Sequence, residues 1–282
     1  MWRFINSPTV RWRAFAGYQP GAEDVIVATF AKSGTNWTMQ IALQIAHFGE
    51  AEYEHIHDLV AWPDAPLPLI RAKLSDDGLA ADSPTGLRVI KTHYEQAHVP
   101  YSTEAKYIIV LRDPKDVFVS SYHFARSVFG SAFTFDYSPE EWLEFYLSEH
   151  FPLGSWANHA ASWWPLRNEE NVLLTTFSEM KLGTRAKIGQ IADLMDVALS
   201  DEQMAEVLRK SNFEYMKPLD HKFVVPISSL FGGDDSGVTM MRKGEAGGSD
   251  EMLNEAQKKQ IDDFMQAELA RLGSEFPYKE YF

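Results

Sequence analysis

The sequence contains no cysteine among its 282 residues, and it has no long uninterrupted apolar stretch. The first absence excludes disulfides and thiolate metal sites and fits a reducing compartment. The second argues against a transmembrane helix, which needs about 18 consecutive apolar residues. The N-terminal stretch MWRFINSPTVRWRAF also lacks the apolar segment and the small-residue cleavage site of a secretory signal. We therefore expect a cytoplasmic protein without a membrane partner.

Positive charge is also scarce, because the formal net charge is −14. Proteins that bind nucleic acids usually carry a basic stripe along the binding surface, so we expect no nucleic-acid partner. Any anion-binding site must instead be local. The positions of the few clustered Lys and Arg residues are therefore informative.

Apolar residues are plentiful: 45% of the residues are hydrophobic and 13% are aromatic, enough for a sizeable core in one domain over 1–282. Near-continuous apolar runs predict buried strands over 25–30, 87–90, 107–111 and 171–177. Helical spacing predicts helices over 36–48, 114–127, 138–150, 155–167, 184–195 and 251–272. Strands that alternate with helices indicate an α/β fold with a central, mostly parallel sheet.

The stretch AKSGTNW lies between the first predicted strand and the first predicted helix. Gly34 permits a close backbone approach, the helix N-terminus adds partial positive charge, and Lys32 supplies a cation. Neutral hydrogen bonds would come from Ser33, Thr35 and Asn36. The pattern predicts a P-loop-like, phosphate-binding strand–loop–helix, and an ordinary turn with a surface lysine is the alternative.

The loop differs from the nucleoside triphosphatase pattern G-x-x-x-x-G-K-[ST], in which the lysine follows the glycine. Here Lys32 precedes Gly34. This order disfavours a small-molecule kinase, which stays as an alternative hypothesis.

A second cluster, Lys91-Thr92-His93, ends the predicted strand 87–90. The carboxyl ends of parallel strands are where α/β sheets place their ligands. A histidine with a near-neutral pKa can accept the proton of an incoming hydroxyl, and an adjacent lysine can hold an anionic group. A hydrogen-bonded structural histidine is the alternative.

A third cluster follows the strand 107–111. The planar guanidinium of Arg112 suits a terminal phosphate, and Ser120, about two helical turns further on, can project toward the same ligand. Asp116 is expected to form an ion pair or a cap instead of acting in catalysis.

A fourth cluster, Met240-Met241-Arg242-Lys243-Gly244, lies in a loop over 223–250 that is rich in Gly, Ser and Asp. Such a long loop late in an α/β chain is typical of a functional segment. Two cations beside a glycine suit a loop that closes over an anion, and a solvated basic pair is the alternative. Four anion-binding clusters in an acidic protein are hard to explain as independent surface features.

Together the segments AKSGTNW, KTH, RDPKDVFVSSYHF and MRKGEAG resemble, in order and spacing, the cytosolic sulfotransferases that use 3′-phosphoadenosine 5′-phosphosulfate (PAPS). The resemblance covers about Asp24 to Gly247 and implies a sheet with helices on both faces. It implies transfer of the sulfuryl group from PAPS to a hydroxyl of a small acceptor, with 3′-phosphoadenosine 5′-phosphate (PAP) as product and no metal. A catalytically silent PAPS-binding protein is a further alternative, which Lys32 and His93 disfavour.

The resemblance also implies roles for individual residues. His93 would be the general base, Lys32 would stabilise charge on the bridging oxygen, and Lys91 would hold the sulfuryl oxygens. Ser120 is a further catalytic candidate. The 5′-phosphosulfate is expected at Lys32, Ser33, Gly34, Thr35 and Asn36. The 3′-phosphate is expected at Arg112, Ser120, Met241, Arg242, Lys243 and Gly244. Adenine is expected between Trp37 and Phe213, with Ser211 and Phe177 nearby.

Several positions depart from the family pattern. Asn36 replaces a usual second threonine, Ser211 stands in place of another threonine, and Phe177 replaces a tyrosine whose hydroxyl often reaches the adenine. The Lys-Thr-Val-Glu dimer motif is not recognisable over 250–259, so the usual dimer is not predicted.

Aromatic residues are frequent in the segments expected to line the acceptor pocket, which are 15–18, 93–101, 122–135 and 223–231. They favour an apolar or aromatic alcohol or phenol as the acceptor. Glu95 would suit a cationic amine, and solvated surface is the alternative for this residue.

Overall fold

Strand β1 (Asp24–Thr29) lies at the centre of a five-stranded sheet with the order β2-β3-β1-β4-β5. The computed structural model describes residues 14–65, 74, 78–130, 137–151, 153–224 and 237–282. The other strands are β2 (Val60–Ala61), β3 (Arg88–Thr92), β4 (Lys106–Leu111) and β5 (Val172–Thr176). All the strand pairs of this sheet are parallel. The predicted α/β fold with a mostly parallel sheet is therefore confirmed.

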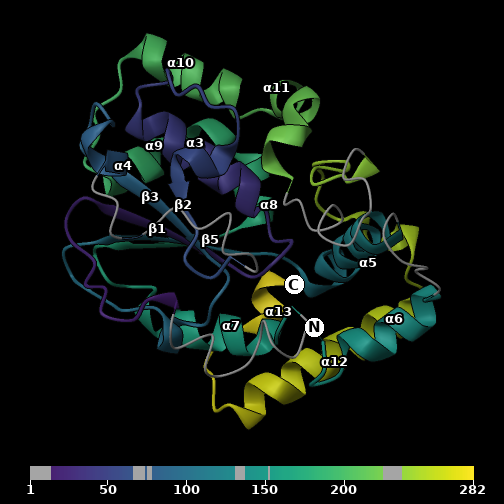
Figure 1. The fold of residues 1–282 in the computed structure, drawn as a ribbon. Coiled ribbons are helices and arrows are strands. Elements are labelled where there is room, and N and C mark those ends of the chain that lie inside the picture. Colours follow the sequence, from purple (N-terminus) through teal and green to yellow (C-terminus); the bar gives the residue numbers. More distant parts are fainter. Residues whose placement is uncertain (1–13, 66–73, 75–77, 131–136, 152, 225–236) are drawn as a thin grey trace.

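Helices cover both faces of the sheet. Successive side chains of a strand point to opposite faces, so each strand contributes to the packing on both. Val25 and Val27 of β1 belong to one buried cluster, together with residues of α3, α9 and α10. Ile26 and Ala28 belong to the other, together with residues of α5, α6, α7 and α12. Figure 1 shows α3, α9 and α10 above the sheet and α7 and α12 below it. The expected covering of both faces is thus confirmed.

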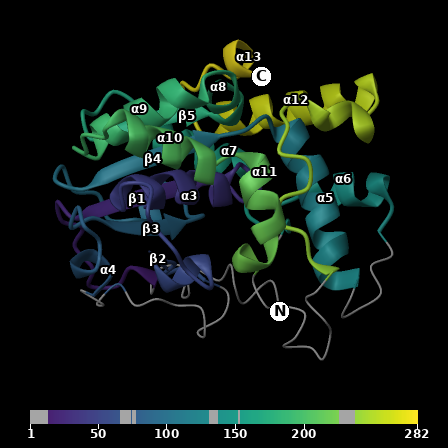
Figure 2. The ribbon, with the colours of Figure 1, turned by 90° about the horizontal axis from the view of Figure 1, so that it is seen from above.

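The helices have the following bounds: α3 (Thr35–Ala46), α4 (Gly78–Ala81), α5 (Pro114–Gly130), α6 (Pro139–Tyr146), α7 (Trp156–Trp163), α8 (Phe177–Leu182), α9 (Thr184–Leu194), α10 (Asp201–Lys210), α11 (Phe213–Met216), α12 (Glu255–Arg271) and α13 (Tyr278–Tyr281). Short 3₁₀ turns cover Ile56–Asp58, Gln96–His98, Trp164–Leu166, Lys217–Phe223 and Gly248–Glu251. Both views place α5 and α11 beyond the same end of the strands, and α4 near the opposite end (Figure 1 and Figure 2).

Some predicted boundaries were wrong. The strand predicted over 171–177 ends at Thr176, because the Thr176 hydroxyl accepts the backbone N–H of Glu179 and starts α8. The last long helix was predicted from residue 251, but it begins at Glu255 behind an Asn254–Gln257 capping box. Residues 225–236 of the predicted loop lie outside the described residues.

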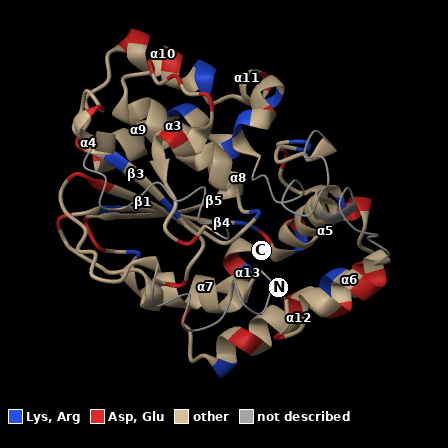
Figure 3. Cartoon of the chain, viewed as in Figure 1, with Lys and Arg blue, Asp and Glu red and all other residues tan. Residues whose placement is uncertain are grey.

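Acidic residues are spread over the outward helices α6, α10 and α12, as Figure 3 shows. This distribution agrees with the expectation that any anion site is local. In the ranges that the structure describes, no helix combines the length and the apolarity needed to cross a bilayer.

Candidate active site

A cavity of about 410 Å³ lies where β1, β3 and β4 end. Its wall includes residues that come directly after these strands, among them Phe30, His93 and Arg112. Every residue predicted from the sequence contributes to the wall except Ser33: Lys32, Gly34, Thr35, Asn36, Trp37, Lys91, His93, Arg112, Ser120, Phe177, Ser211, Phe213, Met241, Arg242, Lys243 and Gly244. Four sequence segments that are far apart in the chain thus meet at one place.

The loop between β1 and α3 has the backbone of an anion site. Lys32 and Gly34 both have left-handed conformations, with φ of 69° and 93°. Among the described residues, no side chain caps the α3 N-terminus, and the first turn of α3 has no acidic residue. The Ser33 hydroxyl is buried, and it has no hydrogen-bond partner among the residues that the structure describes. A buried hydroxyl and a free helix N-terminus are groups that a bound phosphate can satisfy.

The Phe177 ring leaves no room for a side chain at position 34, which is a second reason for glycine there. A Cβ atom at position 34 would lie 2.7 Å from Cδ2 of Phe177, which is closer than real Cβ contacts. The Phe177 ring in turn meets the Trp37 ring edge-on at 5.5 Å between centroids. The Arg112 guanidinium lies 4.6 Å from the Phe177 ring centroid. The Phe177 ring therefore contacts the loop at Gly34, Trp37 of α3 and the Arg112 guanidinium at the cavity wall.

Arg112 joins the β1 loop to the late loop. Its Nη1 donates to the Lys32 carbonyl at 3.1 Å, and its Nη2 donates to the Glu245 carbonyl at 3.0 Å. Asp116, one helical turn away, forms an ion pair with Arg112 at 3.5 Å and accepts the Gly247 N–H at 2.8 Å. Asp116 thus has the pairing role that was expected of it.

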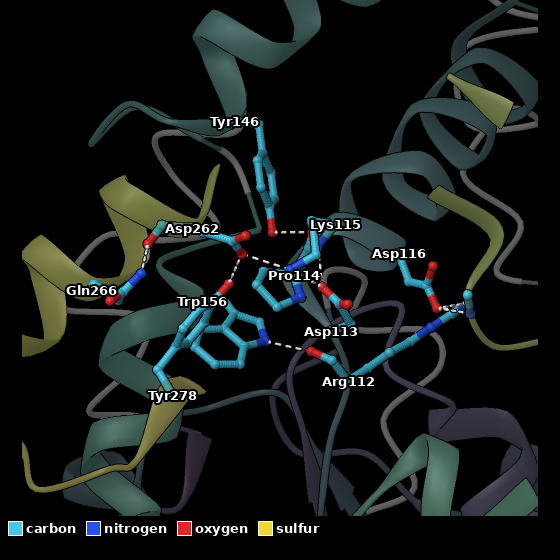
Figure 4. Close-up of polar contacts among 11 residues, drawn as sticks. Arg112, Asp113, Pro114, Lys115, Asp116, Tyr146, Trp156, Asp262, Gln266 and Tyr278 are labelled. Carbon is cyan, nitrogen blue, oxygen red and sulfur yellow. Dashed lines mark hydrogen bonds and ion pairs between the residues drawn. The ribbon is translucent and has the colours of Figure 1, made fainter. Parts of the chain in front are cut away.

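The turn that carries Arg112 is held by polar contacts from α7, α12 and α13 (Figure 4). The Trp156 indole N–H of α7 donates to the Arg112 carbonyl at 3.0 Å. Asp262 of α12 accepts from Lys115 Nζ at 2.6 Å and from the Tyr278 hydroxyl at 2.7 Å. These contacts fix the start of α5 and, with it, the direction of the guanidinium.

His93 is held at two points. Its Nδ1 lies 2.9 Å from the Thr29 carbonyl oxygen, and because a carbonyl only accepts, Nδ1 must carry the proton. Its backbone N–H donates to Asp64 Oδ2 at 2.9 Å. Desolvation and the Lys91 charge hold the His93 pKa well below its usual range, so the ring is neutral. Nε2 then carries the free lone pair that a general base needs.

Two lysines lie near this histidine, and each contacts an aromatic ring. Lys91 Nζ is 3.4 Å from the Trp62 ring centroid, and Lys32 Nζ is 4.1 Å from the Phe124 ring centroid. Burial, followed by the Arg112 charge, lowers the pKa of Lys32 to about 8. Burial also lowers the pKa of Lys91, against the opposing attraction of Asp64. An anion in the cavity would stabilise the charged form of both lysines.

A family model described as a sulfotransferase domain matches residues 22–273. This chain belongs to the sulfotransferase family. Sulfotransferase 2A1 of Macaca fascicularis is 30% identical to it, over 91% of this chain and 88% of the relative. Sulfotransferase 1B1 of Mus musculus is 30% identical, over 96% of this chain and 91% of the relative.

Solved structures show the same fold. A retinol dehydratase in complex with androsterone and the inactive cofactor PAP matches with a TM-score of 0.75 and 23% identity, covering 94% of this chain and 85% of that chain. The mouse sulfotransferase SULT7A1 complexed with PAP matches with a TM-score of 0.71 and 22% identity, covering 99% and 94%. The resemblance and the fold expected from the sequence motifs are therefore confirmed.

The sulfotransferase site also contains residues that sequence reasoning missed. Trp62 directly follows β2, Asp64 comes two residues later, and both line the cavity. His159 of α7 lines it as well; this residue is buried, and neither ring nitrogen has a hydrogen-bond partner within the described ranges. Burial lowers the pKa of His159 to about 3 and keeps it neutral. A two-residue strand leaves no apolar run in the sequence, and His159 lies inside an ordinary helix pattern.

The predicted acceptor segments have different outcomes. His93, Tyr94, Glu95 and Phe124 line the cavity. The expectation for residues 15–18 was wrong, because Tyr18 binds the Asp24 carboxylate, and Asp24 is the first residue of β1, at the end of the strand away from the cavity. Residues 131–135 and 225–231 lie outside the described residues.

Proposed function

We propose that this sulfotransferase moves the sulfuryl group of PAPS to a hydroxyl of a small apolar or aromatic alcohol or phenol, leaving PAP. The observation that carries the proposal is the fixed tautomer of His93. Its Nδ1–H donates to the Thr29 carbonyl, so its Nε2 is the unprotonated nitrogen, and Lys32 and Lys91 line the same cavity as His93. A neutral base beside two cations fits the attack of a hydroxyl on an anionic donor.

The residues present fit the donor. Lys32 suits the 5′-phosphosulfate, as do the N-terminus of α3 and the Ser33 hydroxyl, which have no capping side chain and no hydrogen-bond partner, respectively, among the described residues. Arg112, Arg242 and Lys243 suit the 3′-phosphate, with Ser120, Met241 and Gly244 beside them on the same wall. Trp37 and Phe213 are the two aromatic rings that we assign to adenine, next to Ser211 and Phe177.

PAPS supplies the sulfuryl group, and its bond from sulfur to the bridging oxygen breaks as the acceptor oxygen bonds to sulfur. His93 Nε2 accepts the proton of the acceptor hydroxyl. Lys32 stabilises the negative charge that develops on the bridging oxygen, and Lys91 stabilises the sulfuryl oxygens. A general base typically contributes about 10²- to 10⁴-fold in rate. We include Ser120 as a hydrogen-bond donor at the phosphate side of the site.

The proposed acceptor class follows from the apolar part of the wall. Phe30, Trp62, Tyr94, Val119 and Phe124 all line the cavity. Such a surface favours an apolar or aromatic body that carries one hydroxyl.

A cytoplasmic location is part of the same proposal, and the cysteine-free sequence supports it.

Thermal unfolding with added nucleotides tests the donor assignment. PAP should raise the melting temperature, and AMP should raise it much less, because only PAP fills the 3′-phosphate site of the folded state. Equal shifts with PAP and AMP would contradict the assignment. A larger shift with ATP and Mg²⁺ would favour a kinase.

Turnover with labelled PAPS and a panel of alcohols, phenols and amines tests the reaction. His93→Ala should abolish transfer while the affinity for PAP stays within about twofold, since the base contributes to the rate and not to donor binding. Loss of PAP affinity in this variant would contradict a base role. Transfer to amines alone would overturn the acceptor class.

A further inference from the structure

Glu251 binds the two loop cations that we assign to the 3′-phosphate. Both of its carboxylate oxygens lie 2.7 Å from Arg242 Nη1, and Oε2 lies 2.8 Å from Lys243 Nζ. Oε1 also lies 3.3 Å from His123 Nε2 on α5. The carboxylate comes from the 3₁₀ turn Gly248–Glu251, between the late loop and α12. One side chain of the protein thus presents an anion to the groups that a phosphate would need.

We propose that Glu251 competes with the 3′-phosphate of the donor for Arg242 and Lys243, and so determines how strongly donor and product are distinguished from nucleotides without that phosphate. This inference rests on the proposed function. A carboxylate and a phosphate seek the same N–H donors. If Glu251 stays in place, its charge repels the phosphate, and if it moves away, its own ion pairs are lost. Both routes weaken binding of the 3′-phosphate.

The ion pairs of Glu251 with Arg242 and Lys243 are weak enough for a bound phosphate to displace. The side chains of Glu251, Arg242 and Lys243 are 30%, 32% and 51% exposed. Ion pairs at such exposed positions contribute little stability, because water screens them. Arg112 differs, since its side chain is 14% exposed and its guanidinium is bound to two backbone carbonyls. The predicted phosphate site therefore has one fixed cation and two that Glu251 shares.

The competition persists at every ordinary pH. Hydrogen bonds from Lys243 and Arg242 hold the Glu251 pKa at about 2, so the carboxylate is ionised in any working buffer. Glu251 therefore lowers the affinity for PAP continuously and is not an acid-operated switch. Weaker product binding favours faster product release, a step that limits turnover in many enzymes.

The decisive comparison is Glu251→Gln against Glu255→Gln in the full chain. The control removes the same charge from a neighbouring carboxylate that is 90% exposed and pairs with Lys258. Calorimetry with PAP and with AMP, each at low and at moderate salt, gives the dissociation constants. We expect Glu251→Gln to bind PAP about three- to tenfold more tightly and AMP unchanged. Its PAP affinity should also fall more steeply with salt. Glu255→Gln should match the parent protein.

The possible outcomes separate the two proposals. If the parent protein prefers PAP to AMP but Glu251→Gln binds PAP no more tightly, the competition is wrong and the proposed function stands. Weaker PAP binding in Glu251→Gln would likewise overturn the competition, because Glu251 would then orient the two cations. If the parent protein does not prefer PAP to AMP, both proposals fail. Glu251→Ala repeats the test with a second side chain and should change PAP affinity in the same direction.

Discussion

His93 Nδ1 donates its proton to the carbonyl of Thr29 at 2.9 Å, and Thr29 is the last residue of β1. The loop with Lys32 begins just after the same strand. One strand end therefore fixes the tautomer of the proposed base and also positions the cation proposed for the leaving group. The relative placement of the two groups depends on the register of β1 and β3, which pairs Ala28 with Thr92.

The pH dependence of kcat/KM for PAPS should report the protonation state of Lys32. Its pKa is lowered to about 8, so Lys32 loses its charge as the pH rises through that value, and kcat/KM for PAPS should fall above about pH 8. The lowered pKa of His93 keeps the base neutral, so the acidic limb should lie below pH 6.5. Lys32→Arg should move the alkaline limb to higher pH, because a guanidinium keeps its charge. Rates measured between pH 5.5 and 9.5 check this, and an unchanged limb in Lys32→Arg would assign it elsewhere.

Asp64 should act on the reaction through His93 and Lys91. It accepts the His93 backbone N–H, and its charge raises the pKa of Lys91 against the effect of burial. Asp64→Asn keeps an acceptor oxygen but loses the charge that favours the protonated form of Lys91. We therefore expect kcat to fall about tenfold, and the decline of kcat that follows loss of the Lys91 charge to begin at lower pH. PAP affinity should change by less than about twofold.

Asp64→Ala separates the two effects of Asp64. It removes the acceptor as well as the charge, so it should lower kcat further than Asp64→Asn does. A merely structural role for Asp64 would lower the melting temperature and leave the pH profile in place. A pH profile of kcat for both variants, together with their melting temperatures, therefore decides between the roles.

The sequence was sufficient for the parts of the site that follow long strands. Lys32, His93 and Arg112 come soon after apolar runs, and a parallel sheet brings such positions together at one edge. Asp64 could not be found in this way, because β2 has only two residues and leaves no periodic pattern. Its hydrogen bond to His93 depends on how β2 pairs with β3, and that pairing is a tertiary contact.

The segment between the late loop and α12 shows a second feature that could not be predicted from the sequence. A helix from residue 251 agreed with the apolar spacing, but the Asn254 side chain caps the backbone N–H of Gln257 and delays the start of α12 to Glu255. That delay leaves Glu251 in a 3₁₀ turn. Charge pairing between Glu251 and Arg242 crosses nine positions of irregular chain, so no periodic pattern could have predicted it.

Gly34→Ala should destabilise the protein and abolish donor binding. The new Cβ would lie 2.7 Å from Phe177 Cδ2, in a residue whose φ is 93°. Strain of this kind costs about 1–3 kcal/mol, and relief would require the loop to move. Gly86→Ala is the matched control, because Gly86 has φ of 72° and no atom of the described residues would lie within 4 Å of a new Cβ.

Thermal unfolding and PAP titration of both glycine variants measure the two parts of this effect. Gly86→Ala should lose stability only through its backbone conformation and should keep its PAP affinity. Gly34→Ala should cost less stability in a Phe177→Ala background than in the parent protein, because the clashing ring is then absent. Equal losses in Gly34→Ala and Gly86→Ala would show that the contact with Phe177 is unimportant.

Arg112→Lys should weaken PAP binding although it keeps the charge. The guanidinium reaches the Lys32 and Glu245 carbonyls at the same time and lies 4.6 Å from the Phe177 ring centroid, which an ammonium group cannot reproduce. We expect PAP affinity to fall about tenfold, or about 1.4 kcal/mol, and AMP affinity to fall less. Arg167→Lys is the control, since the Arg167 guanidinium also stacks on an aromatic ring, that of Trp164 at 4.4 Å from the centroid, but Arg167 is not among the residues that line the cavity. Titration of both variants with PAP and AMP checks the expectation. An equal loss for the two nucleotides would mean that Arg112 shapes the loops without contacting the 3′-phosphate.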